Sequence, residues 1–180
     1  QTAALRANIN TVNAAANTGG VTAILNGSQT ITVTGGTGNE RLTTGAVLTT
    51  GTVNAGAGTD DRLTVAASAH ITAAAGARYL GFESLEVVNG VTVDASQLAA
   101  NNTLTAARFT TGGVMNNMTA AQALNTTVTT GGNSATFGIA GATNPGTNNT
   151  LAITVSDEAA TTANIALATP VAAGVESISI

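Results

Sequence analysis

Two glycine-rich stretches of the sequence each end in a carboxylate, a combination that can bind a hard cation. Glycines precede Glu40 in GGTGNERL and precede Asp60 in AGAGTDDRL, 20 residues further on. The glycines repeat at the same interval: Gly36 with Gly56 and Gly38 with Gly58. Because charged residues make up only 8% of the chain, their concentration beside two tight turns indicates a specific role.

Calcium coordination is one explanation for these turns. Ca²⁺ takes about six to eight oxygen ligands. Glycine lets the backbone turn through positive φ so that successive carbonyls face one point, and a carboxylate adds charge. One turn would supply half of a shell, and a turn stacked on it would complete the shell. The candidate calcium ligands are therefore Gly36, Thr37, Gly38, Glu40, Gly56, Ala57, Gly58, Asp60 and Asp61.

Turn geometry alone is the other explanation, since glycine with Asp or Asn forms tight turns in many β proteins. Both explanations stay open at this point. If calcium binds, Glu40 and Asp60 are the first choice of carboxylates. Asp61 is the substitute for Asp60, because Leu63 comes one residue later in its motif than Leu42 does.

Three other carboxylates are weaker candidates. Glu83 in GFESLEV and Glu176 in GVESISI occupy equivalent places in a repeat 93 residues apart. Each could bind a cation or could accept hydrogen bonds from the backbone at a corner of the chain, and we favour the backbone role. Asp157 in TVSDEAA fits a solvated turn better than a calcium site. His70 is a lone imidazole, which is more often hydrogen-bonded or exposed than a metal ligand.

Composition limits the function. The 180 residues are 43% hydrophobic but include only three Phe, one Tyr and no Trp, so Ala, Val, Leu and Ile must pack a narrow core. No catalytic triad, zinc site or groove with paired carboxylates is recognisable, so we do not expect an enzyme. All five cations are scattered arginines and the net charge is −4, which excludes a nucleic-acid footprint. No apolar run reaches the roughly 20 residues of a transmembrane helix.

Strand signals dominate the elements that must position these residues. Alternating or β-branched runs separated by Gly, Asn and Ala clusters occur at 30–34, 63–65, 84–88, 91–95, 127–130, 151–155 and 177–180. Short strands with no amphipathic helices between them predict an all-β fold. Self-similarity within the chain favours a right-handed parallel β-solenoid or β-roll with short irregular coils over an immunoglobulin-like sandwich, which would leave the glycine turns unexplained.

The repeats also predict an order of segments. Residues 1–29 form an N-terminal arm or linker, in which Leu5, Ile9 and Val12 have the spacing of a short helix. Residues 30–98 form a glycine-turn module that ends with the GFES repeat, and residues 99–180 form a second solenoid module that ends with GVES. A chain that begins with Gln and ends on a strand-like GVESISI is expected to be a fragment of a longer protein.

The motifs resemble those of a known family. GGTGNERLT fits the nonapeptide pattern of RTX proteins, with Glu40 in the place of Asp and Leu42 at the hydrophobic position. Together with VNAGAGTDDRLTV, GFESLEV and the stretch from LAITVSDEAA to GVESISI, it resembles the RTX-type, calcium-dependent surface-layer proteins of Gram-negative bacteria of the alphaproteobacterial kind. The resemblance covers most of residues 30–180.

This resemblance implies a structural role. It implies Ca²⁺ bound in solenoid turns, type I secretion to the extracellular cell surface, and self-assembly into a lattice, the S-layer. Any contact with lipopolysaccharide would belong to a part of the protein outside this chain. The alternative is a segment of a large RTX adhesin that binds a host or abiotic surface, for which four aromatic residues offer little material for a binding patch.

Overall fold

The computed structural model of the protein describes residues 4–129, 135–144, 149–156 and 174–180. Strands account for about 40% of the residues, and the described part contains only two short α-helices. The strands within each sheet pair in parallel, so the predicted parallel all-β fold of repeated coils is confirmed. Contacts divide the chain into two compact units: unit 1 (Gln1–Leu85 and Gln97–Thr103) and unit 2 (Glu86–Ser96 and Leu104–Ile180).

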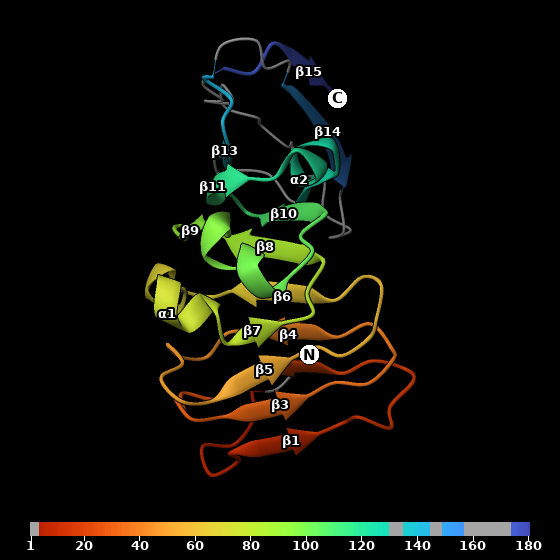
Figure 1. The fold of residues 1–180 in the computed structure, drawn as a ribbon, viewed down its shortest axis with the longest axis vertical. Helices are drawn as coiled ribbons and strands as arrows, with labels where there is room; N and C mark the ends of the chain where they lie inside the picture. The colour runs from red at the N-terminus through yellow and green to blue at the C-terminus, as the bar shows by residue number, and fades with distance from the viewer. Residues whose placement is uncertain (1–3, 130–134, 145–148, 157–173) are drawn as a thin grey trace. The chain divides into compact units, whose positions relative to one another are not determined.

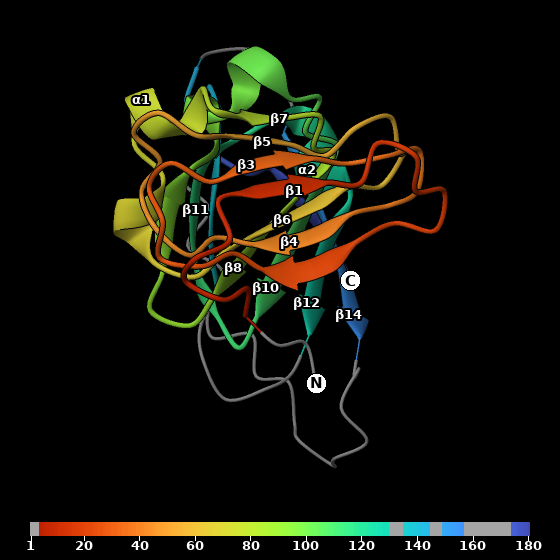
Figure 2. The ribbon, with the colours of Figure 1, turned by 90° about the horizontal axis from the view of Figure 1, so that it is seen from below.

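Unit 1 consists of coils that contribute one strand to each of two parallel rows (Figures 1 and 2). One row contains β1 (Thr11–Asn13), β3 (Thr32–Thr34), β5 (Thr52–Asn54) and β7 (Tyr79–Leu80). The other contains β2 (Thr22–Ile24), β4 (Arg41–Thr43) and β6 (Arg62–Val65). A short helix, α1 (Ala73–Gly76), and a 3-10 turn at Ser68–His70 lie between β6 and β7.

The side chains in unit 1 follow the two-residue period of a strand. The central residues of β3, β4 and β5, Val33, Leu42 and Val53, are buried between the rows, while their threonine, asparagine and arginine neighbours point outward. Valine and leucine side chains fill the interior between these three strands, as the composition predicted. β-branched Val and Thr favour the extended backbone on both faces.

The N-terminal segment differs from its prediction. Residues 4–29 contain no helix; they form β1, β2 and the turns around them. Val12 pairs in register with Val33, and Leu5 N–H donates to Ile24 O at 2.8 Å. The asparagine- and threonine-rich stretch around Val12 has low helix propensity, and pairing with the neighbouring strands satisfies its backbone groups instead.

Unit 2 also contains two parallel rows. One has the order β9 (Thr92–Asp94), β11 (Gly113–Met118), β13 (Ala135–Ile139). The other has the order β10 (Ala106–Thr110), β12 (Thr126–Thr129), β14 (Thr150–Ser156), β15 (Ser177–Ser179). β8 (Ser84–Val88) crosses the division between the units, and 3-10 turns occupy Ala95–Gln97 and Ala99–Asn101.

Unit 2 contains helix α2 (Ala120–Leu124) and a pair of aromatic rings in contact. Helix α2 begins with a capping box between Thr119 and Gln122. The core contains Phe109 and Phe137, whose ring centroids lie 4.7 Å apart in an edge-to-face arrangement. Neither helix of the described residues is long and apolar enough to cross a membrane.

Candidate cation site

The two predicted glycine turns lie on successive coils of unit 1, in backbone contact. Thr37 N–H donates to Asn17 O at 3.0 Å, and Ala57 N–H donates to Gly36 O at 2.8 Å. A Cβ on Gly36 would lie 1.9 Å from Asn17 O, and one on Gly56 would lie 2.2 Å from Gly36 O. The turns therefore need glycine because one backbone stacks on the next without room for a side chain.

Positive φ explains the need for glycine at fewer positions of these turns than expected. Among the candidate glycines only Gly56 has a positive φ, 106°. The expectation that positive φ shapes both turns is therefore wrong for Gly36, Gly38 and Gly58. Close approach between coils is what excludes a side chain at these positions.

Strand pairing places Glu40 level with Asp61. Arg41 pairs with Arg62, so the residues that precede them are neighbours on successive coils. The turn before β6 is one residue longer than the turn before β4, and Asp60 occupies the extra position. The expected pairing of Glu40 with Asp60 is thus replaced by pairing with Asp61.

Asp60 faces solvent instead. Its Oδ2 lies 2.5 Å from Arg41 Nη2, and the Asp60 side chain is 56% exposed. Arg41 also donates to the Asp60 carbonyl. An exposed ion pair of this kind contributes little to stability, and it leaves Asp60 outside the buried site.

Glu40 and Asp61 are both fully buried and join Glu83 in a ladder, with one carboxylate on each coil. Glu40 N–H donates to Asp61 Oδ1 at 2.6 Å, and Asp61 N–H donates to Glu83 Oε2 at 2.9 Å. Gly36 N–H donates to Glu40 Oε1 at 3.2 Å. Each carboxylate in this carboxylate ladder therefore has one oxygen committed to a backbone amide.

Two other oxygens of the ladder lack a partner. Glu40 Oε2 and Asp61 Oδ2 are buried and accept no hydrogen bond. Burial raises the pKa of Asp61 to about 7; the neighbouring carboxyl of Glu40 and the charge of Glu83 act in the same direction, and the Glu40 N–H opposes them. Up to about neutral pH, burial therefore favours a proton on Asp61, and a bound cation would take the place of that proton.

Two glycines lie against these carboxylates at positions where a side chain would not fit. A Cβ on Gly58 would lie 2.5 Å from both Asp61 Oδ1 and Gly38 O. A Cβ on Gly35 would lie 1.9 Å from Ala55 O and 3.0 Å from Glu40 Cδ. Backbone carbonyls of Gly38 and Ala55 thus border the carboxylate pair, and the donor set of two carboxylates and two carbonyls fits an oxygen-preferring cation.

Three other candidate ligands do not supply a free oxygen atom to this arrangement. Thr37 and Ala57 are exposed, and the Gly36 carbonyl already accepts the Ala57 N–H. Within the described residues, no group of three or more Asp, Glu, His or Cys side chains gathers as a metal site. A cation here would therefore depend on backbone oxygens as well as on Glu40 and Asp61.

No family model, curated protein or solved structure matches this chain. The resemblance to surface-layer proteins accordingly stays a prediction, and the site is interpreted from its geometry.

The repeated glutamates make the same backbone contacts in the two units. Glu83 N–H donates to Asp61 O at 3.1 Å while its carboxylate accepts the Asp61 N–H. Glu176 N–H donates to Asn149 O at 3.1 Å while its Oε2 accepts the Asn149 N–H at 2.6 Å. Each glutamate thus makes two hydrogen bonds to the backbone of the residue just before a strand of the preceding coil. That residue is Asp61 before β6 and Asn149 before β14. This is the backbone role that we favoured from the GFES and GVES repeat. Asp157 lies outside the described residues.

Three other polar residues have structural partners. His70 Nδ1 lies 2.8 Å from Thr44 Oγ1, and burial lowers the pKa of the imidazole.

Sequence reasoning missed Glu86, which is buried in β8 and accepts a hydrogen bond from Thr110 Oγ1 at 2.5 Å. It also missed Asn102, whose amide binds the backbone of three residues: Tyr79, Phe82 and Leu98. No motif in the sequence marks either residue.

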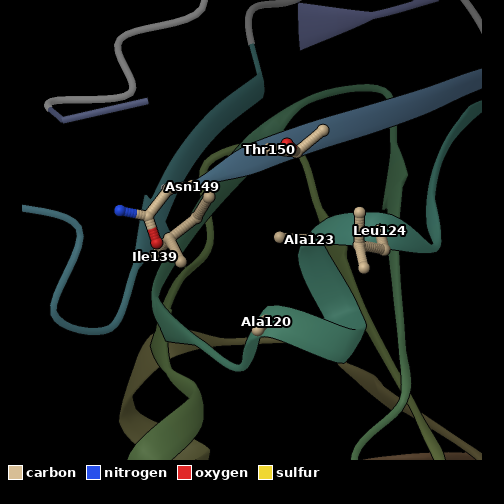
Figure 3. A pocket seen from close by; sticks show the side chains of 6 residues that line it. All are labelled: Ala120, Ala123, Leu124, Ile139, Asn149 and Thr150. Atoms are coloured by element: carbon tan, nitrogen blue, oxygen red, sulfur yellow. The ribbon is translucent and has the colours of Figure 1, made fainter. Parts of the chain in front are cut away.

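A separate hollow in unit 2 lies beside α2, between it and the ends of β13 and β14 (Figure 3). It has a volume of about 120 Å³ and is lined by Ala120, Ala123, Leu124, Ile139, Asn149 and Thr150. None of these side chains is ionisable, so the hollow supplies no acid, base or charged ligand. The carboxylate ladder remains the candidate site.

The first prediction concerns the metal-free protein. In chelator, the free energy of unfolding should fall as the pH rises from about 4 to about 7, because folded Asp61 keeps its proton up to about pH 7 whereas unfolded Asp loses it near 3.8. The folded state then binds more protons than the unfolded state across this window. Asp61→Asn should remove this component, as measured by urea unfolding at successive pH values.

Asp60→Asn is the matched control, because Asp60 is exposed and should leave the pH dependence unchanged. The lowered pKa of His70 acts in the opposite direction, with stability lost as the pH falls below about 6.5, but it is present in all three proteins and cancels in the comparison. Parallel pH profiles for the wild type and Asp61→Asn would contradict the assignment of Asp61.

Proposed function

We propose that this chain is a structural module of a secreted bacterial surface-layer protein, in which Ca²⁺ bound between stacked glycine turns stabilises the solenoid. The observation that supports the proposal is the pair of buried, partnerless oxygens, Glu40 Oε2 and Asp61 Oδ2, on successive coils. Two like charges in a poorly solvated interior repel each other and are costly to bury without a counter-charge. A cation removes both costs.

Calcium fits this position better than other metals. The candidate ligand atoms are oxygens: carboxylates from Glu40 and Asp61 and carbonyls from Gly38 and Ala55. No cysteine exists in the chain, and its one histidine, His70, contacts Thr44 outside the ladder. Hard oxygen sets of this kind suit Ca²⁺, whose coordination geometry is more adaptable than that of Mg²⁺. The ion would supply charge neutralisation and cross-linking between coils.

The surface chemistry is consistent with assembly of like copies. The outward positions of β1, β3 and β5 carry small uncharged polar side chains: Thr11, Asn13, Thr32, Thr34, Thr52 and Asn54. The net charge of −4 with no lysine makes copies repel each other until cations reduce that charge. We propose that calcium promotes lattice formation on the extracellular cell surface, and that any lipopolysaccharide contact involves a part of the protein outside this chain.

An adhesin segment is less well supported. Recognition of a host surface or a sugar commonly uses exposed aromatic side chains. All four aromatic residues of the chain, Tyr79, Phe82, Phe109 and Phe137, are buried. The same observation argues against a carbohydrate-active enzyme, which would need such side chains along a groove.

The second prediction tests the calcium site directly. In calorimetric titration the wild type should bind Ca²⁺, and its free energy of unfolding should rise by about 2.7 kcal/mol at a free calcium concentration of 100 times Kd. Asp61→Asn should lose most of this binding and stabilisation, because it removes one of the two anionic ligands. Thermal melting with and without chelator measures the stabilisation.

Asp60→Asn again serves as the control. It removes the same charge as Asp61→Asn, but from the neighbouring residue, whose side chain is exposed. It should keep the calcium response. A calcium response of Asp61→Asn as large as that of Asp60→Asn and of the wild type would show that the glycine turns serve geometry alone. Light scattering of the parent protein in the same titration should show association with calcium and none in chelator; assembly that is the same in both would exclude calcium-driven lattice formation.

A further inference from the structure

Two Asn-Gly pairs occur in the chain, Asn26–Gly27 and Asn89–Gly90. In such a pair the glycine amide nitrogen can attack the asparagine side-chain amide, because glycine has no Cβ to obstruct the approach. The structure places the two pairs in opposite surroundings.

Asn26 is held firmly in unit 1. Its side chain is buried, and its Nδ2 donates to Arg6 O at 2.8 Å and to Ile9 O at 2.7 Å. Its Oδ1 accepts the Ser28 N–H at 3.0 Å. Rotation of this amide toward the Gly27 nitrogen would break all three bonds.

Asn89 is exposed on the turn between β8 and β9, where Val91 N–H donates to Val88 O at 3.1 Å. Gly90 has φ 75°, and nothing lies within 4 Å of the position a Cβ would take. No hydrogen bond joins the Asn89 side chain or the Gly90 N–H to the rest of the described chain. Both reacting groups are therefore accessible and unrestrained.

We propose that Asn89 is a site of spontaneous deamidation. The Gly90 nitrogen attacks Cγ of Asn89, forming a C–N bond and closing a succinimide ring. The Cγ–Nδ2 bond breaks, and the proton lost from the Gly90 amide leaves with the amide group as ammonia. Water then opens either carbonyl of the ring, which leaves aspartate or isoaspartate at this position.

The modification would change unit 2 locally. Either product adds a negative charge to the turn, and isoaspartate adds one carbon atom to the backbone. Val91, which follows the Asn89–Gly90 pair, is buried, and its carbonyl accepts the Val114 N–H at 2.8 Å. A longer backbone in the turn would therefore disturb the pairing of β9 with β11. This reaction is independent of the proposed calcium site.

Incubation of the folded chain at pH 8 in ¹⁸O-labelled water, followed by trypsin digestion and mass spectrometry, tests the proposal. The tryptic peptide from Tyr79 to Arg108 contains Asn89, and the peptide from Ala7 to Arg41 contains Asn26. Label should enter at Asn89 at least about tenfold faster than at Asn26, because the three hydrogen bonds of Asn26 must open first. In denaturing urea this rate ratio should fall toward one.

Asn89→Gln is the matched variant, because it keeps an amide but disfavours the five-membered ring. It should abolish fast labelling of the Tyr79–Arg108 peptide. Fast labelling that persists in Asn89→Gln would assign the reaction to another asparagine of that peptide and overturn the proposal. Equal rates at Asn26 and Asn89 in the folded chain would overturn it as well.

Discussion

Replacement of Gly36 by alanine is expected to lower the free energy of unfolding by about 3 kcal/mol or more. The new Cβ would lie 1.9 Å from Asn17 O and 2.9 Å from Ala14 O, which are backbone atoms of the preceding coil. Relief requires the coils to move apart, which weakens the bond from Thr37 N–H to Asn17 O. Urea unfolding of Gly36→Ala measures the loss.

Gly27→Ala is the control for this substitution. No atom lies within 4 Å of the new Cβ, and Gly27 has no positive φ. The alanine should leave stability unchanged or raise it by up to about 1 kcal/mol, since it reduces the freedom of the unfolded chain. Comparable losses from both variants would mean that the coils do not stack as closely as the structure indicates.

Truncation of Phe109 in unit 2 is expected to have an equal or larger effect. Phe109→Ala should cost about 3–5 kcal/mol, because it removes a fully buried ring and leaves a cavity. It also removes the edge-to-face contact with Phe137. Chemical denaturation of the variant, followed by circular dichroism, measures the change.

Leu124→Ala provides the comparison in the same unit. The Leu124 side chain is 58% exposed, so its removal should change stability by no more than about 0.5 kcal/mol. A loss as large as that of Phe109→Ala would show that Leu124 is covered in solution. A small loss from Phe109→Ala would argue against the aromatic core of unit 2.

Much of the fold could be predicted from strand patterns. The seven predicted runs all contain strands, and SLEVV at 84–88 coincides with β8. Strands such as β4 and β5 were missed because glycine-rich turns flank their three residues closely and leave no longer alternating run. They exist because a neighbouring coil on each side supplies their hydrogen bonds, a condition that no local pattern contains.

The pairing of carboxylates on neighbouring coils was predicted with an error of one residue, with Asp61 as the substitute. Counting from the glycines matches Glu40 with Asp60, whereas strand register matches it with Asp61. The repeated Arg-Leu pair, at 41–42 and 62–63, carried the correct interval of 21 residues, because the buried leucine fixes which residues face inward. Of the bordering carbonyls, that of Gly38 belongs to a predicted candidate residue, whereas that of Ala55 could not be predicted, since it depends on how closely one coil approaches the next.

The carboxylate ladder also has a direction along the chain. The Glu40 amide is capped by Asp61 and the Asp61 amide by Glu83, so each coil receives its cap from the coil that follows it. A polypeptide that appears N-terminus first therefore always has an uncapped newest coil. Folding that begins at the C-terminal side would instead place each arriving coil against carboxylates already in position. The order in which the chain emerges from a ribosome or a secretion channel thus determines whether the growing end of unit 1 is capped as it forms.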